Sequence, residues 1–111
     1  FMAVLFKPLQ LLGPNDLRVT LTDETGIPFD PYVITYAFYR GTQTRGFYRV
    51  GLGDRVPTRQ SEGVYYVGET LSTEFIVGDY YIEWTIQRTD TTPKEIIGKK
   101  EFGVASYGYN A

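Results

Sequence analysis

Carboxylates are the side chains that come nearest to forming a chemical site in this sequence. Four of them fall near the ends of predicted strands: Asp16, Asp23, Glu24 and Asp30. Clustered loop carboxylates are typical calcium ligands, but the alternating D-x-D-x-D spacing of a calcium loop is absent from the sequence. A hydrolase with paired carboxylates needs two acids that face each other across a cleft, and no pattern here predicts one. We interpret these acids as a solvated edge.

A glycine pair is the second pattern with chemical meaning. The stretch GLG at 51–53 could begin a dinucleotide-binding loop. Such a fingerprint needs a preceding strand, a third glycine and a following helix. The residues that follow, DRVP at 54–57, predict no helix. We therefore interpret the glycine pair as part of a turn.

The chain of 111 residues contains no Cys and no His. Without His it lacks the usual general base, and a Ser-His-Asp triad cannot be assembled from this chain alone. Without Cys it lacks a thiol nucleophile, a Cys-based zinc site and disulfides. We predict that the protein is not an enzyme, has no catalytic residues, takes no small-molecule substrate and uses no cofactor or metal.

Strand patterns dominate the chain, and no window shows sustained helical periodicity. Hydrophobic alternation predicts strands over 17–23, 32–40, 47–50, 64–68, 79–88 and 94–104, with a loop over 51–63. Residues 70–77 are ambiguous between a strand and a loop. Gly26 is predicted to end the 23–26 turn in the left-handed region. About six to eight short strands in one domain favour a β-sandwich.

The stretch GDYYIEWTI at 78–86 predicts the centre of the core. Its large apolar residues recur at every second position: Tyr80, Ile82, Trp84 and Ile86. We predict a central strand whose Trp84 packs against Ile34 and Phe38, with Tyr81 on the solvent face. The lead-in of Gly78, Asp79 and Tyr80 resembles the corner before the sixth strand of immunoglobulin-like domains.

Charge is segregated along the chain although the formal net charge is only −2. Five arginines and a single acid lie between residues 40 and 59: Arg40, Arg45, Arg49, Arg55 and Arg59, with Asp54. Five acids and no Lys or Arg lie between residues 62 and 83. The pattern fits two solvated strand faces, or a bipolar domain whose basic 45–59 segment binds an acidic neighbour. A nucleic-acid partner is not favoured by a pI near 5.0.

The N-terminal stretch FMAVLFKPLQLLGP is apolar, with Lys7 and Gln10 as its only strongly polar side chains. It is either a first strand that packs on the core or an arm that reaches a neighbouring subunit. No apolar run is long enough to cross a bilayer. On the arm hypothesis we expect a chain that lacks residues 1–12 to stay folded but not to assemble. The predicted partner-binding residues are Phe1, Met2, Val4, Leu5, Phe6, Leu9, Leu11, Leu12, Arg45, Arg49, Arg55 and Arg59.

Several motifs over residues 15–104 carry a resemblance to a known class of proteins. They are the D-x-T-G-x-P turn at 23–28, the VITYAFY strand at 33–39, the G-x-Y-x-x-x-W stretch at 78–84 and the closing F-x-V at 102–104. In these features the chain resembles small immunoglobulin-like β-sandwich proteins of tailed bacteriophage virions. Such proteins serve as head decoration, neck or tail components and do no chemistry. The resemblance implies a structural role in a symmetric assembly and supplies no binding residues.

Together these patterns predict an all-β, immunoglobulin-like β-sandwich of about seven antiparallel strands. The predicted divisions are an apolar arm or first strand over 1–14, the sandwich over 15–105 and a tail over 106–111. The expected function is that of a virion structural protein bound to other virion proteins and to copies of itself, without a membrane. The alternative is a carbohydrate- or protein-binding module of a secreted or cell-surface protein that uses Tyr65, Tyr81 and Tyr107.

Overall fold

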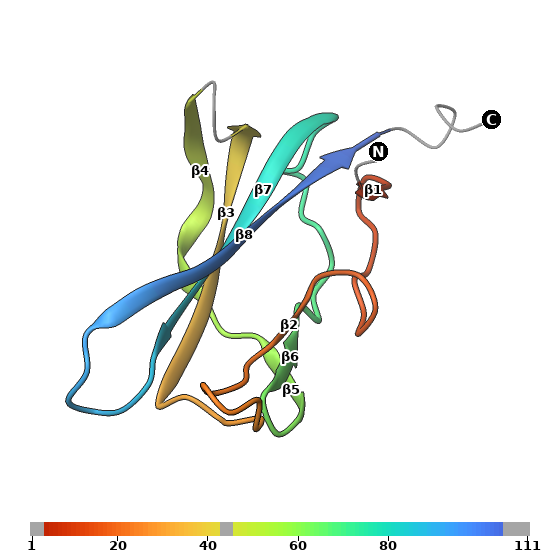
Figure 1. Ribbon diagram of the computed structural model, residues 1–111. Helices are drawn as coiled ribbons and strands as arrows, with labels where there is room; N and C mark the ends of the chain where they lie inside the picture. The colour runs from red at the N-terminus through yellow and green to blue at the C-terminus, as the bar shows by residue number, and fades with distance from the viewer. Residues whose placement is uncertain (1–3, 43–45, 106–111) are drawn as a thin grey trace.

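All regular structure in the described part of the chain is β-structure (Figure 1). The computed structural model describes residues 4–42 and 46–105. The eight strands are β1 (Val4–Phe6), β2 (Arg18–Thr20), β3 (Val33–Thr42), β4 (Gly46–Arg55), β5 (Thr58–Ser61), β6 (Val64–Tyr66), β7 (Gly78–Gln87) and β8 (Lys94–Val104). Within the described ranges there is no helix with the length and apolar character needed to cross a membrane.

The strands form two sheets. The five-stranded sheet has the order β1-β8-β7-β3-β4, and the three-stranded sheet has the order β2-β6-β5. The predicted all-β, two-sheet organisation is confirmed. The expectation of antiparallel strands throughout is wrong for one pair, because β1 runs parallel to β8, with Val4 opposite Phe102. The predicted division at residue 14 stays a prediction, and residues 106–111 lie outside the described part.

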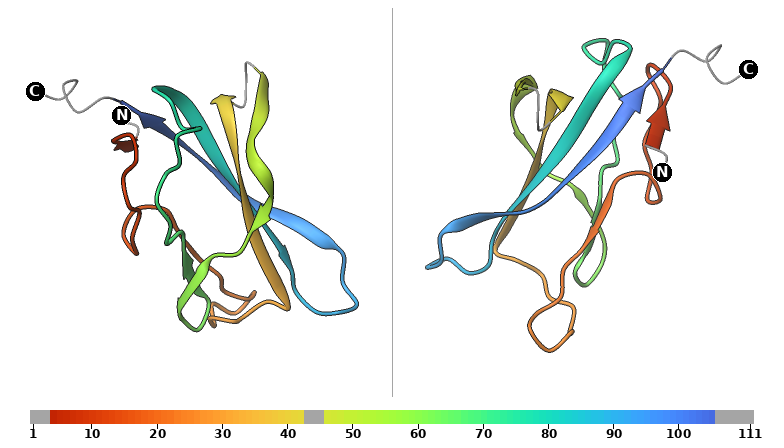
Figure 2. Two further views of the ribbon diagram at one scale, coloured as in Figure 1. Left: turned by 180° about the vertical axis from the view of Figure 1, so that it is seen from behind. Right: turned by 45° about the horizontal axis from the view of Figure 1, so that its top comes forward.

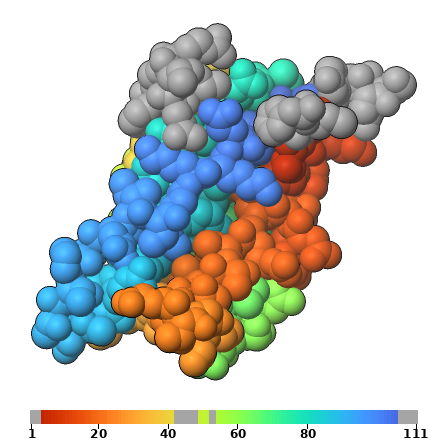
Figure 3. Space-filling view, viewed as in Figure 1, coloured from red at the N-terminus to blue at the C-terminus, as the bar shows by residue number. Residues whose placement is uncertain are grey.

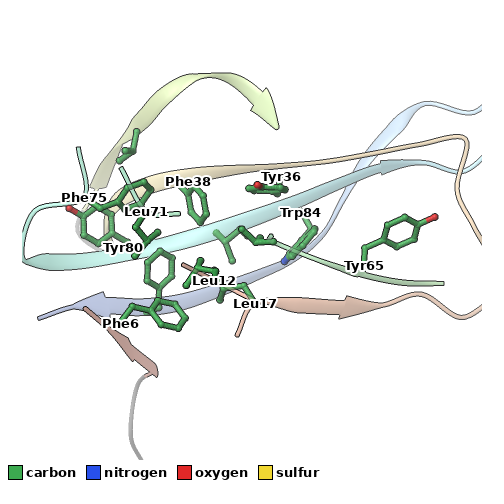
Figure 4. Close-up of a cluster of buried hydrophobic side chains, with 14 of the residues drawn as sticks. Phe6, Leu12, Leu17, Tyr36, Phe38, Tyr65, Leu71, Phe75, Tyr80 and Trp84 are labelled. Carbon is green, nitrogen blue, oxygen red and sulfur yellow. The ribbon is translucent and has the colours of Figure 1, made fainter. Parts of the chain in front are cut away.

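The core lies between the two layers and is centred on β7, the middle strand of the larger sheet (Figure 4). The prediction that 80–86 forms a central strand is confirmed. Trp84 lies directly opposite Tyr36, and its predicted neighbours Ile34 and Phe38 lie diagonally, opposite Ile86 and Ile82, in the same core cluster. The rings of Trp84 and Tyr36 have their centroids 5.5 Å apart. The alternation thus identified the buried faces of both strands, and the structure adds Tyr36 as the direct partner of Trp84.

Tyr81 lies on the outer face of β7, yet its exposed fraction is only 1%. Its ring stacks on that of Tyr39, with centroids 5.1 Å apart and planes at 17°. The Lys99 ammonium lies 5.8 Å from the centroid of Tyr81. The expectation of a solvated Tyr81 is wrong because a neighbouring aromatic ring and a long cationic side chain cover it.

Irregular chain completes the second layer beside the small sheet (Figure 2). The segments 7–17 and 67–77 are hydrogen-bonded to each other: Leu12 N donates to Glu69 O at 3.0 Å, and Leu71 N donates to Gln10 O at 2.9 Å. Their buried side chains include Leu12, Leu71 and Phe75. The ambiguous 70–77 stretch is thus a loop whose apolar residues contribute to the core, with a single bridge from Thr70 to Leu11.

The predicted 51–63 loop is the largest error in the secondary structure, because β4 continues to Arg55 and β5 occupies Thr58–Ser61. Glycine is the physical reason. Gly51 has a φ of 83°, which permits a bulge in the edge strand. While β3 advances from Tyr36 to Phe38, β4 spans Val50 to Arg55. The glycine pair that suggested a turn therefore marks an irregular strand.

The predicted 23–26 turn is confirmed. Gly26 has a φ of 87° and donates its N–H to Asp23 O at 3.0 Å. The turn at 89–92 joins β7 to β8 as an antiparallel hairpin, with Thr92 N donating to Thr89 O at 3.3 Å.

Candidate protein-binding surfaces

The N-terminal segment is anchored to its own chain at both ends. Phe6 and Leu12 are buried in the core. Ala105 N donates to Phe6 O at 3.0 Å, and Leu12 N donates to Glu69 O. Removal of residues 1–12 would delete these two core side chains, so the truncated chain is no longer expected to stay folded. Partner binding by this segment stays a prediction, and Phe1 and Met2 lie outside the described residues.

Between its anchors the segment makes a tight turn over residues 7–10. Gln10 N donates to Lys7 O at 3.2 Å, and Lys7 N donates to the Gln10 side chain at 2.9 Å. Leu9, the third residue, has a φ of 61° and is the only non-glycine residue of the described part with positive φ. Pro8 before it fits a type II turn, in which this third position favours glycine. Leu9 is therefore a strained residue, and such strain persists where the surroundings or a function require it.

Three leucines of this segment project from the surface. The exposed fractions are 47% for Leu5, 58% for Leu9 and 69% for Leu11. Because Phe6 and Leu12 point inward, the backbone that carries these leucines is held in place. Anchored exposed aliphatic side chains bind a partner at little cost in conformational entropy. We define Leu5, Leu9 and Leu11 as the leucine ridge.

Replacement of Leu9 by Gly is expected to leave the free energy of unfolding unchanged or to raise it. Removal of the side chain relieves about 1–2 kcal/mol of left-handed strain, which offsets the entropic cost of glycine of about 0.5–1 kcal/mol. Leu11→Gly is the matched control. Its free energy of unfolding should fall by the entropic cost of glycine, because no strain is relieved at this position. Urea unfolding of both variants measures the difference. A Leu9→Gly variant less stable than Leu11→Gly would show that the turn is not strained.

Three arginines of the 45–59 segment have acidic partners in the same chain. Arg49 pairs with Asp54, Arg55 with Glu69, and Arg59 with Asp30 at 2.9 Å. The Arg49–Asp54 pair lies within the basic segment, and the Arg55–Glu69 pair joins the basic segment to the acidic one. Part of the predicted charge segregation is therefore neutralised within the chain. Arg45 lies outside the described residues. Binding of a neighbour by these arginines stays a prediction, and a neighbour would have to compete with these pairs.

Glu69 joins two strands of the large sheet to the second layer. One carboxylate oxygen accepts a hydrogen bond from Tyr36 OH, and the other accepts one from Arg55. Burial, and then the bond to Glu69, raises the pKa of Tyr36 above its ordinary value. The cluster satisfies polar groups at the edge of the core. Both carboxylate oxygens of Glu69 are bonded to side chains of the large sheet, and we interpret the cluster as structural.

Asp30 holds the 28–31 link against the β5–β6 hairpin. Its carboxylate accepts hydrogen bonds from Gly63 N at 3.0 Å, from Tyr65 OH at 2.7 Å and from both Nε and the terminal nitrogen of Arg59. Arg59, then Gly63 and Tyr65, hold the pKa of Asp30 well below its ordinary value. Burial, and then the bond to Asp30, raises the pKa of Tyr65 to about 12. The residue pattern around Asp30 predicts only a solvated edge, because its partners Arg59, Gly63 and Tyr65 lie 29 to 35 residues away in the chain.

The substitution Asp30→Asn is expected to lower stability at neutral pH and to reduce the sensitivity to acid. Because the folded-state pKa of Asp30 is lowered, its contribution is fully present above the unfolded value of about 4 and is lost as the pH falls below it. The stability difference between wild type and variant should therefore shrink below about pH 4. Urea unfolding between about pH 2 and 7 measures it. Asp90→Asn, in the exposed 89–92 turn, is the control, and a constant difference across this range would contradict the assignment.

Two of the three tyrosines predicted for carbohydrate binding are not exposed. Tyr65 and Tyr81 are both buried, so neither ring is available to stack on a sugar, and Tyr107 lies outside the described residues. Within residues 4–42 and 46–105, no three Asp or Glu side chains are grouped so that they could hold a metal ion. Comparison of the chain with protein-family models, with curated proteins and with solved structures finds no match.

Proposed function

We propose that this protein is a non-catalytic structural component of a tailed-bacteriophage virion, with an immunoglobulin-like fold. It would bind neighbouring subunits through exposed aliphatic side chains. The virion assignment rests on the sequence resemblance over residues 15–104. The fold assignment and the protein-binding role draw support from the geometry as well.

The strand order supports the immunoglobulin-like assignment. In that fold one sheet contains strands B, E and D, and the other contains C, F and G, with C′ added in variable-type domains. Here β2, β6 and β5 occupy the positions of B, E and D. The run β4-β3-β7-β8 reproduces C′, C, F and G. Chain order and sheet order therefore agree with that topology at seven strands.

The start of β7 supplies a second, independent feature. Immunoglobulin-like domains often carry a tyrosine near the start of strand F whose hydroxyl bonds the backbone a few residues upstream. Tyr80 OH donates to Ile76 O at 2.6 Å, four residues earlier. The chain departs from antibody domains in two ways: it has no Cys, and its only Trp lies on β7 rather than on the strand equivalent to C.

The observation that carries the protein-binding role is the strained, exposed Leu9 at the tip of an anchored turn. Glycine would suit this position better, and an exposed leucine does not help to bury the core. A side chain kept against local preference is explained if a partner covers it. Leu5 and Leu11 are the other two exposed leucines of the same anchored segment.

Electron cryo-microscopy of the tailed particles produced by the source tests the proposal. We expect density for the two-sheet domain at symmetry-related positions, with the leucine ridge covered by another subunit. Particles without density for the domain would contradict the virion role. Density with the ridge facing solvent would contradict the binding surface. The carbohydrate-binding alternative lacks a supporting observation, since two of its three tyrosines are buried.

A further inference from the structure

A groove opens between the two sheets on the side where β2 faces β8, and Figure 3 shows the two segments side by side. It exists because β1 covers only residues 102–104 of β8, while β2 is the edge of its own sheet. The groove has a volume of about 170 Å³, and its floor is formed by Leu17, Val19, Trp84 and Gly98. Next to it lies a wider hollow of about 410 Å³ that shares Val19. The narrow part is apolar and suits an aliphatic side chain.

The rim of this groove is basic. It carries Arg18, Lys99 and Lys100. Lys99 pairs with Glu83 at 3.5 Å. Arg18 and Lys100 are exposed and make no ion pair with another described residue. An aliphatic segment flanked by acids would complement such a groove.

The chain carries such a segment at the corner before β7. Ile76 and Val77 are 51% and 57% exposed, and the acids Glu74 and Asp79 flank them. The corner is held rigidly because Phe75 before it and Tyr80 after it are buried, with ring centroids 5.1 Å apart. Tyr80 OH also bonds the carbonyl of Ile76. The corner therefore presents two aliphatic side chains in a fixed conformation, flanked by Asp79 and by Glu74, which also accepts a hydrogen bond from Gly51 N at 3.1 Å.

The corner and the groove of one chain cannot meet. Gly78 and Trp84 are six residues apart on β7, which corresponds to about 20 Å along a strand. The contact must then be made between two copies, and because the two surfaces differ, it is head-to-tail. Pairing through the free edge of β8 is less favourable, because this edge carries lysines and a bulge opposite Trp84 and Thr85.

We propose that the Ile76–Val77 corner of one copy docks in the β2–β8 groove of a second copy, with Glu74 and Asp79 near Arg18 and Lys100. Repetition of this contact closes into a ring or extends as a filament, according to the rotation between copies. The inference deepens the proposed function and rests on it only for the biological setting. The contact itself is a property of the purified chain.

Sedimentation velocity over a concentration series, up to about 1 mM, tests the contact with four purified chains. They are the wild type, a corner variant (Ile76→Ser with Val77→Ser), a groove variant (Arg18→Glu with Lys100→Glu) and the control Val56→Ser. The control removes an exposed aliphatic side chain that belongs to neither surface. We expect the wild type and the control to associate, and association of each double variant to weaken about tenfold or more. Added salt should weaken the wild-type contact.

A mixture of the two double variants gives the sharpest outcome. The corner variant retains an intact groove and the groove variant an intact corner, so the mixture should form 1:1 dimers and nothing larger. A wild type that stays monomeric, variants that associate like the wild type, or a mixture that stays monomeric would each overturn the proposal. A monomeric wild-type chain that is still found in virions would leave the proposed function intact. An associating chain that is absent from virions would refute the virion role alone.

Discussion

Replacement of Trp84 by Ala is expected to lower the free energy of unfolding by about 3–5 kcal/mol. Trp84 is buried on the central strand, and its ring packs against Tyr36 between the two sheets. Truncation to Ala removes this apolar contact and leaves a cavity at the centre of the core. Because small domains are stable by about 5–15 kcal/mol, the loss is a large fraction of the total.

Urea unfolding followed by circular dichroism measures this effect, since Trp84 is the only Trp and its fluorescence is lost in the variant. Trp84→Phe is the matched control. It keeps an aromatic ring beside Tyr36, so its free energy of unfolding should fall by less than that of Trp84→Ala. The substitution Ile96→Ala, at an exposed position of β8, should change stability by less than about 0.5 kcal/mol. A Trp84→Ala variant as stable as Ile96→Ala would refute the core described here.

The substitution Gly63→Ala is expected to have an effect of similar size for a different reason. Gly63 has a φ of 75°, and a Cβ at this position would lie 2.6 Å from the carbonyl oxygen of Leu21. The left-handed backbone costs about 1–2 kcal/mol, and forced contacts in a packed site cost about 1–3 kcal/mol. The displaced backbone would also weaken the bonds from Leu21 N to Gly63 O and from Phe29 N to Leu21 O, which hold the chain directly after β2.

Gly26→Ala separates these two contributions. Gly26 has a φ of 87°, but nothing lies within 4 Å of a Cβ built there. Gly26→Ala should lower the free energy of unfolding only by the strain of a left-handed alanine, about 1–2 kcal/mol. Gly63→Ala should lower it clearly more. Unfolding midpoints of the two variants in urea give the comparison. Equal losses would show that the segment around Leu21 yields to the added methyl group without cost.

The strands of the core were predictable because their physical signal is local. Alternation of apolar and polar residues at 79–88 and 32–40 indicated two long strands with one buried face each. Register is not local, and this is why the direct pairing of Trp84 with Tyr36 could not be predicted from the alternation alone. The course of β4 was missed because Gly51 and Gly53 resemble a turn in sequence, whereas tertiary pairing with β3 retains them in a bulged strand.

The candidate surfaces were only partly predictable. Composition indicated an apolar N-terminal segment, but which of its residues point inward depends on the pairing of β1 with β8 and of Leu12 with Glu69. The arginine excess suggested free positive charge, whereas Arg55 and Arg59 meet acids that lie 14 and 29 residues away in the chain. The groove between β2 and β8 leaves no sequence signal, because it results from how far β1 extends along β8.

Density-gradient sedimentation of the native source material, with detection of this chain by mass spectrometry, tests the structural role most directly. We expect the chain to travel with a particle of megadalton size together with other virion proteins. This result would mark it as an assembly component that is fixed to its neighbours. Recovery of the chain near the top of the gradient as a free small protein, or only as part of one longer polypeptide, would contradict the virion role.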